Sequence, residues 1–142
     1  ITTVPNTKYY FKAYAQNGTQ KAEGEVMSFI TLPEITVTGG SYGSSSATII
    51  AELPSDIGNA ETLRIGYNLN GTSDIEVTTG DQNNRTHTIE VSNLKDGENT
   101  IKVFAQNSSG KAYSSEITFT KPESDEPIIS WGPGNGSGET IN

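Results

Sequence analysis

The chain has 142 residues, no cysteine and a formal net charge of −8, with nine basic residues against seventeen acidic ones. The basic residues are scattered, so no cationic stripe is available for a phosphate backbone, and the excess of acid opposes binding to an anionic membrane surface. No run approaches eighteen apolar residues, and no charged leader precedes an apolar stretch. Composition therefore disfavours nucleic acid as a partner and membrane insertion, and the abundance of Gly, Ser, Thr and Asn favours thin sheets with polar turns.

Residues 1–32 have the pattern of a β-hairpin. Tyr9, Phe11, Ala13 and Ala15 alternate with polar neighbours, as in a half-buried strand, and residues 26–31 form a second candidate strand after a turn signal at residues 17–18. Two strands bury too little apolar surface to fold alone. We therefore expect their partners to be preceding residues, the neighbouring domain or another chain.

Residues 33–121 carry seven candidate strands separated by turn signals, and no window favours a long helix. The strands are expected at residues 34–38, 47–53, 63–69, 74–79, 86–91, 99–106 and 115–120. Their spacing predicts an all-β sandwich. Alternation within the strands predicts a core made of Ile35, Val37, Ile49, Ala51, Leu63, Ile65, Tyr67, Ile89, Val91, Leu94, Ile101, Val103, Ile117 and Phe119. Residues 122–142, acidic and then Gly-rich, are expected to be a linker and the start of a following segment.

Residues 7–31 and 97–121 are similar when one segment is shifted along the other by 90 positions. The residues that are identical at this offset are Lys12, Ala15, Gln16, Asn17, Lys21, Ala22 and Phe29, which align with Lys102, Ala105, Gln106, Asn107, Lys111, Ala112 and Phe119. A period near 90 residues predicts a repeat array. On this interpretation residues 33–121 are one complete domain, and residues 1–32 are the last two strands of a similar domain.

Two turns carry a family resemblance. The segment PNTKY (residues 5–9) is similar to the Pro-x-Thr-x-Tyr corner of fibronectin type III domains, and LKDGENT (residues 94–100) is closer to a turn of bacterial immunoglobulin-like modules. The chain thus resembles a tandem fibronectin type III or bacterial Ig-like array. The resemblance implies seven-stranded β-sandwiches and a secreted or cell-surface bacterial protein. It also implies a structural tyrosine corner in which the Tyr9 hydroxyl bonds backbone just upstream; Asn99 stands at the corresponding position of the second unit.

Catalytic chemistry has weak support. The single histidine, His87, lies in a predicted strand and is interpreted as a solvated side chain rather than a catalytic base. The carboxylate pairs Asp74 with Glu76 and Asp96 with Glu98 share a strand face, but they match no catalytic or calcium-binding pattern and are interpreted as charges that protect exposed edges. We expect no enzyme activity, no cofactor and no metal.

Outward aromatic residues are the candidate contact sites. Tyr14 and Phe104 lie on the opposite parity from the core residues and could stack on a sugar ring or a partner protein. Because they coincide at the 90-residue offset, a shared packing role is the competing interpretation. Trp131, the only tryptophan, lies in the tail, where it could contact a glycan, anchor the tail or belong to the next core.

The function predicted from these features is that of a non-catalytic structural, spacer or adhesion module of a larger extracellular or cell-surface protein. The expected partners are neighbouring domains of the same polypeptide, with protein or glycan as further candidates. One alternative is a carbohydrate-binding accessory module of a polysaccharide-degrading enzyme. The other is a structural subunit of a fibre, pilus or phage particle in which residues 1–32 complete a sheet by strand addition.

Overall fold

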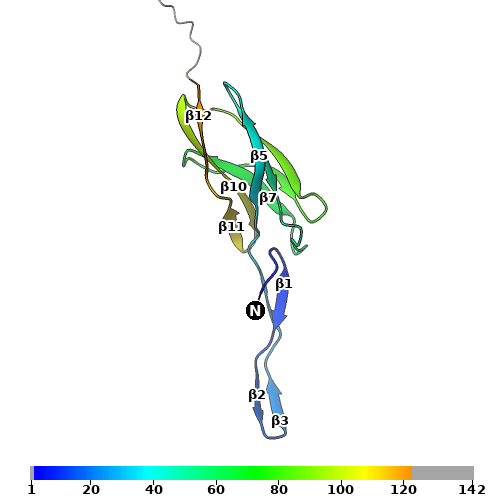
Figure 1. The fold of residues 1–142 in the computed structure, drawn as a ribbon. Helices are drawn as coiled ribbons and strands as arrows, with labels where there is room; N and C mark the ends of the chain where they lie inside the picture. The colour runs from blue at the N-terminus through cyan, green and yellow to red at the C-terminus, as the bar shows by residue number, and fades with distance from the viewer. Residues whose placement is uncertain (1, 123–142) are drawn as a thin grey trace, which may run out of the picture.

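The computed structural model of the chain describes residues 2–122. A narrow two-stranded arm projects from one end of a β-sandwich, and the last strand ends at the opposite end (Figure 1). The described residues form strands, turns and loops without a helix, so the all-β expectation is confirmed.

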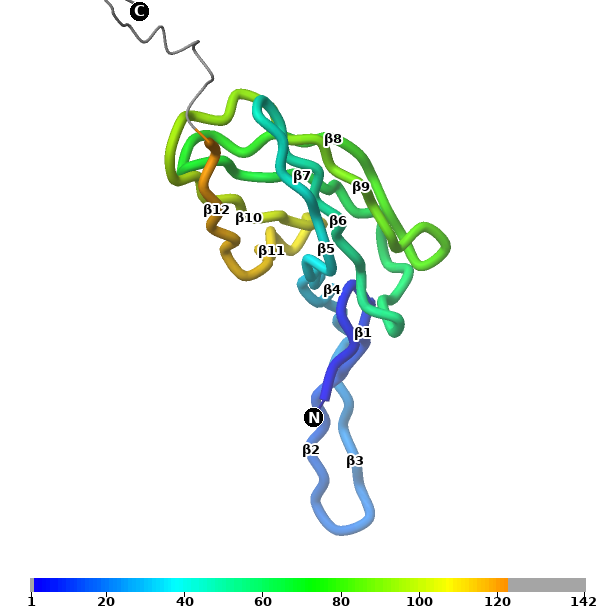
Figure 2. The backbone as a smooth tube through the Cα atoms, turned by 45° about the horizontal axis from the view of Figure 1, so that its top comes forward, coloured from blue at the N-terminus to red at the C-terminus, as the bar shows by residue number. Residues whose placement is uncertain are grey.

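The sandwich consists of two antiparallel sheets. One sheet has the order β5-β6-β9, formed by β5 (Thr36–Tyr42), β6 (Ala47–Glu52) and β9 (Thr86–Val91). The other has the order β11-β10-β7-β8, with β12 also paired to β10. It is formed by β7 (Leu63–Leu69), β8 (Ile75–Gly80), β10 (Gly97–Asn107), β11 (Gly110–Tyr113) and β12 (Ile117–Lys121). β11 and β12 follow one another along the same edge of β10, which is longer than either of them (Figure 2).

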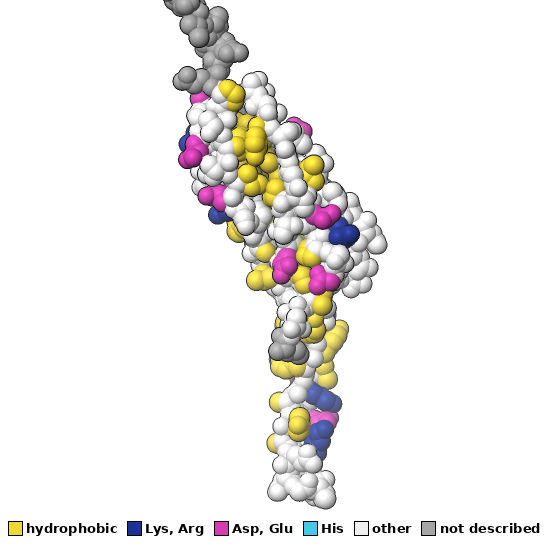
Figure 3. Space-filling model, in the orientation of Figure 1, with side chains coloured by type: hydrophobic (Ala, Val, Ile, Leu, Met, Phe, Trp, Pro, Cys, Tyr) yellow, Lys and Arg dark blue, Asp and Glu magenta, His cyan; other side chains and the backbone are white. Residues whose placement is uncertain are grey.

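Alternate side chains of the two sheets meet in a single core, as the alternating sequence pattern predicts. Twelve of the fourteen expected core residues are buried, and the other two, Val37 and Ile117, are partly buried at its edge. Hydrophobic side chains are visible on the face between β5 and β12 (Figure 3). Val37 and Ile117 line a cavity of about 290 Å³. Ile57, from a short insert between β6 and β7, is a core residue that the strand pattern did not predict.

The arm contains β1 (Lys8–Phe11), β2 (Tyr14–Asn17), β3 (Gln20–Glu23) and β4 (Met27–Ile30). β2 and β3 pair on either side of a turn at Gly18, which has a φ of 60°, and β1 pairs with β4. The expected hairpin is confirmed, and its second half is longer than the predicted strand at residues 26–31 because β3 precedes β4. Two residues separate β1 from β2, whereas three separate β3 from β4. The extra residue between β3 and β4 forms a bulge.

The arm and the hairpin made by β10, β11 and β12 have the same strand register. Four residue pairs join β1 to β4 and four join β2 to β3, and each of them recurs 90 positions later, from Glu98↔Thr120 to Asn107↔Gly110. The backbone bond at the bulge recurs as well, since Gly24 N–H donates to Ala13 O at 2.8 Å and Ser114 N–H to Val103 O at 2.7 Å. The 90-residue correspondence therefore extends from residue identities to main-chain geometry.

Candidate interaction surfaces

The arm meets the sandwich at a polar joint, which we define as residues 5–7 and 30–33 on the arm side and residues 58–61 and 107–110 on the sandwich side. Two backbone hydrogen bonds cross it: Gly58 N–H donates to Pro5 O at 2.9 Å, and Ala60 N–H donates to Asn6 O at 3.1 Å. Gly58 has no room for a side chain, because a Cβ there would overlap Thr7 Oγ1 and lie 2.6 Å from Asn6 O. The two loops are therefore in direct backbone contact.

Asn6 is the central side chain of the joint. It is fully buried, and its φ of 51° is a left-handed conformation that asparagine tolerates better than most residues. Its Nδ2 donates to Gly58 O at 3.0 Å and to Glu61 O at 2.8 Å. Its Oδ1 accepts a bond from Asn107 Nδ2 at 3.1 Å. The side-chain amide thus uses both its donor and its acceptor, as a buried polar group must to avoid a desolvation cost.

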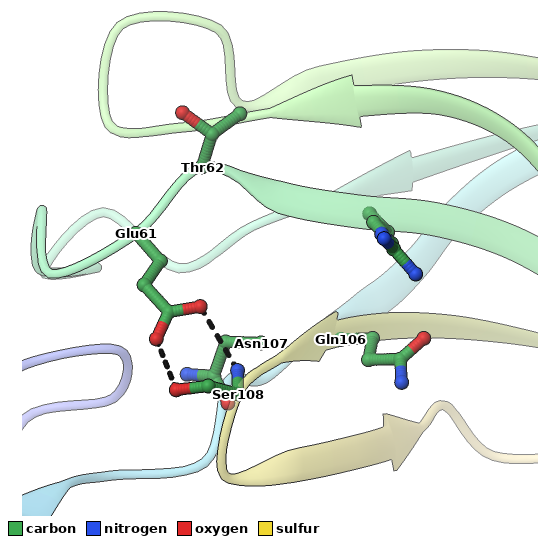
Figure 4. Close-up of a pocket in the computed structure, with 6 residues that line it drawn as sticks. Glu61, Thr62, Gln106, Asn107 and Ser108 are labelled. Atoms are coloured by element: carbon green, nitrogen blue, oxygen red, sulfur yellow. Dashed lines mark hydrogen bonds between the residues drawn. The ribbon is translucent and has the colours of Figure 1, made fainter.

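Asn107, at the end of β10, holds the other side of the joint. Its Nδ2 also donates to Thr31 O at 2.9 Å, so it bonds both arm segments that enter the joint. Beside it, Ser108 N–H donates to Glu61 Oε1 at 2.9 Å, and the Ser108 hydroxyl donates to the other carboxylate oxygen (Figure 4). These residues line a polar cavity of about 350 Å³. The carboxylate of Glu61 fixes the β10–β11 turn against the start of β7.

The two hairpins hold the turn before them with different side chains. The Tyr9 hydroxyl accepts a hydrogen bond from Val4 N–H at 2.8 Å, so the bond expected of the tyrosine corner is present. Asn99, at the corresponding position, accepts from Lys95 N–H at 3.1 Å and donates to Lys95 O at 2.8 Å. Asn99 bonds the backbone of a residue four positions earlier, and the longer side chain of Tyr9 bonds the backbone of a residue five positions earlier.

The arm is amphipathic. Tyr9, Phe11, Met27 and Phe29 share one face, on which the Tyr9 and Phe29 rings stack with their centroids 5.6 Å apart. Phe11 is nevertheless 54% exposed, and Met27 and Phe29 are exposed to a similar degree. The side chains 90 positions later lie in the sandwich core or at its edge; they are Asn99, Ile101, Ile117 and Phe119. An apolar face that is buried in one hairpin is thus open to solvent in the other.

The outward aromatic residues differ in exposure. Tyr14 is 65% exposed, with the Lys21 ammonium 4.7 Å from its ring centroid. Phe104 is outside the core cluster, as its parity predicted, but it is only 2% exposed, because Lys111 and Tyr113 lie over it. Phe104 is therefore a packing residue whose ring a ligand could not reach, and the interpretation of it as a contact site is corrected. Trp131 lies outside the described residues.

Asp74 is the hub of a charged cluster that links the β7–β8 hairpin to β11. Its Oδ2 accepts hydrogen bonds from Lys111 Nζ and the Tyr113 hydroxyl, each at 2.6 Å, and its Oδ1 accepts one from Asn68 Nδ2 at 2.9 Å. Partial burial acts to raise the pKa of Asp74, but these bonds outweigh it and lower the pKa to about 2. Asp74 and Glu76, the carboxylate pair noted in the sequence, therefore have different partners. Glu76 Oε2 lies 3.6 Å from Arg64 Nε.

We expect this cluster to make stability acid-dependent. A carboxyl group whose pKa is lower in the folded state stabilises the fold above its unfolded pKa, and the contribution is lost as pH falls through the folded value of about 2. Asp74→Asn should therefore lower the free energy of unfolding by about 1 kcal/mol at pH 6, a magnitude discounted for solvent screening. The free energies of unfolding of the two proteins, measured in urea, should converge as the pH falls from 4 to about 2. A gap that stayed constant over this range would contradict the assignment.

His87 is buried rather than solvated, which corrects the expectation from sequence. It is 6% exposed on the core face of β9, and its Nε2–H donates to Asn84 O at 2.8 Å. Gly80 allows this packing, because a Cβ there would meet the imidazole ring. The contacts of His87 give it a structural role, holding the β8–β9 turn against the sheet.

Comparison with known proteins gives neither a protein-family model nor a curated protein that matches the chain. Among residues 2–122, no helix is long and apolar enough to cross a bilayer. Over the same described part, no three His, Cys, Asp or Glu side chains come together in a way that could hold a metal ion. The surfaces described above are accordingly the basis for any functional proposal.

Proposed function

We propose that the chain is a non-catalytic structural module that sets the spacing and orientation of neighbouring domains in a larger extracellular or cell-surface protein. In this proposal the sandwich and the arm belong to successive units of a fibronectin type III or Ig-like array. The three-stranded sheet faces a sheet of five strands, in which β11 and β12 pair with successive parts of β10. If β11 and β12 are counted as two parts of one edge strand, this arrangement supports a fibronectin type III-like unit. The register that recurs after 90 residues supports the same assignment for the arm.

The observation that carries the proposal is the joint. A flexible linker would leave two units free to reorient, because the few contacts between domains are usually weak. Here the chain passes from arm to sandwich through the fully buried Pro33, and Asn6 and Asn107 bond both sides through buried amides. Buried hydrogen bonds are directional and costly to leave unpaired, so they favour one orientation over others. A fixed orientation is the property that a spacer needs.

Spin-label distances test this rigidity directly. Because the chain has no cysteine, Thr19→Cys at the arm tip and Ser92→Cys in the loop after β9 give two unique labelling sites. The labels should give one narrow distance distribution in the otherwise unchanged chain. Gly58→Ala should broaden it, because the added methyl group forces the Thr7 side chain and the Asn6 backbone away.

The matched control is Gly39→Ala in β5, where the added Cβ would only meet Ile50 Cδ1 at an ordinary 3.7 Å. This variant should leave the distribution narrow. Thermal unfolding should show that both variants retain a folded sandwich. A broad distribution in the unchanged chain, or an unaltered one in Gly58→Ala, would refute the spacer proposal.

A further inference from the structure

The free edge of the arm corresponds to an edge of the sandwich whose partner is known. In the sandwich, β7 pairs antiparallel with β10 over Ile101 to Gln106. Ninety positions earlier the same edge runs from Phe11 to Gln16, and within residues 2–122 the arm strands pair only with each other. The β7–β10 pairing therefore indicates which kind of strand would pair with the arm edge.

The β7–β10 pairing has a specific alternation of side-chain size. Ala105 is opposite Ile65 and Val103 is opposite Tyr67, so smaller residues of β10 face larger ones of β7. Between them Phe104 is opposite Gly66, and a Cβ on Gly66 would lie 2.7 Å from Phe104 Cζ. The Phe104 ring occupies part of the space that a side chain at residue 66 would need, and Ile75 O of β8 occupies another part. Glycine in the middle of a strand marks such a close approach.

The arm presents the same series of sizes. Ala13, Tyr14 and Ala15 correspond to Val103, Phe104 and Ala105, and a lysine lies over the outward ring in both hairpins, Lys21 in the arm and Lys111 in the sandwich. Two small alanines leave space for large neighbours across the strand pair. The Tyr14 ring, like that of Phe104, should exclude any side chain directly opposite.

We propose that the Phe11–Gln16 edge of the arm binds an antiparallel β-strand with a large apolar residue, a glycine and a second large apolar residue in succession, the glycine lying opposite Tyr14. The occupant is a strand of the β7 type from a β-sandwich unit, and its apolar side chains extend the open face that carries Phe11 and Phe29. Main-chain hydrogen bonds would supply affinity, and the glycine would supply selectivity. This inference rests on the proposed assignment of the arm to a sandwich unit.

The test attaches a second copy of the β7 sequence, residues 62–70, upstream of Ile1 in the full chain through a flexible Gly/Ser linker. Tethering raises the effective concentration of the strand to about millimolar. The probe is amide hydrogen exchange in the segment Phe11–Gln16. We expect the added strand to slow exchange there by about tenfold or more relative to the untethered chain, as new ladder hydrogen bonds form. Gly66→Val in the added copy alone should abolish this protection.

Tyr14→Ala isolates the reason for the selectivity. With the ring removed, the added strand carrying Gly66→Val should protect the edge about as well as the glycine version. Absence of protection by the glycine version would overturn the proposal, and so would equal protection by both versions in the presence of Tyr14. The spin-label experiment on the joint does not depend on this edge, so failure of the strand proposal and failure of the spacer proposal can be told apart.

Discussion

Ile101→Asp is expected to unfold the sandwich. Ile101 has no exposed surface and lies in the middle of β10, opposite Leu69 of β7 and Ile117 of β12. An unpaired carboxylate at this position would cost several kcal/mol, which is comparable with the total of about 5–15 kcal/mol that stabilises a domain. Circular dichroism melting at neutral pH should show the cooperative transition lost or lowered by more than about 15 °C.

The 90-residue correspondence supplies a control for this prediction. Phe11 is the equivalent of Ile101 but is 54% exposed on the arm, so Phe11→Asp places the same carboxylate in solvent. The sandwich transition should then stay within about 2 °C of the unchanged chain, as for most surface substitutions. Equal losses from both substitutions, or an unchanged melt of Ile101→Asp, would contradict the strand and core assignments.

Strand parity was sufficient to predict most of the core, because each sheet has one buried face and the side-chain period of two repeats along it. Ile89 and Val91 follow this rule, and so does His87, which has the same parity. The interpretation of His87 as a solvated side chain does not use this parity. The parity signal is the better guide here, since Gly80 leaves space for the ring and Asn84 O accepts a hydrogen bond from its Nε2–H.

The burial of Phe104 could not be read from parity. Its outward direction is correct, but the residues that cover it, Lys111 and Tyr113, belong to β11, which the sequence pattern does not predict as a strand. The contacts of the joint could not be predicted from the sequence either. Asn6 bonds to residues 52 and 101 positions away, and no local pattern specifies contacts at such distances. A buried asparagine is also contrary to the usual location of that residue type.

Gly66→Val is the second substitution with a large expected effect. A Cβ at residue 66 would overlap Ile75 O and lie 2.8 Å from Glu76 Cα and 2.7 Å from Phe104 Cζ. Gly66 lies where the register between β7 and β8 shifts, so neighbouring backbone approaches it more closely than in a regular ladder. We expect a loss of about 3 kcal/mol or more in the free energy of unfolding, measured in urea.

Two further variants separate this steric cause from a general loss of strand stability. Arg64→Val, on the exposed side of the same strand, should change the free energy of unfolding by less than about 0.5 kcal/mol. Phe104→Leu shortens the ring that faces Gly66, so the double variant should lose less than the sum of its two single losses. The recovery should be partial, because Ile75 O is backbone and cannot move aside. If the two losses in the free energy of unfolding were fully additive, the Phe104 ring would not require glycine at residue 66. By the same register, the Tyr14 ring of the arm would not require a glycine opposite it.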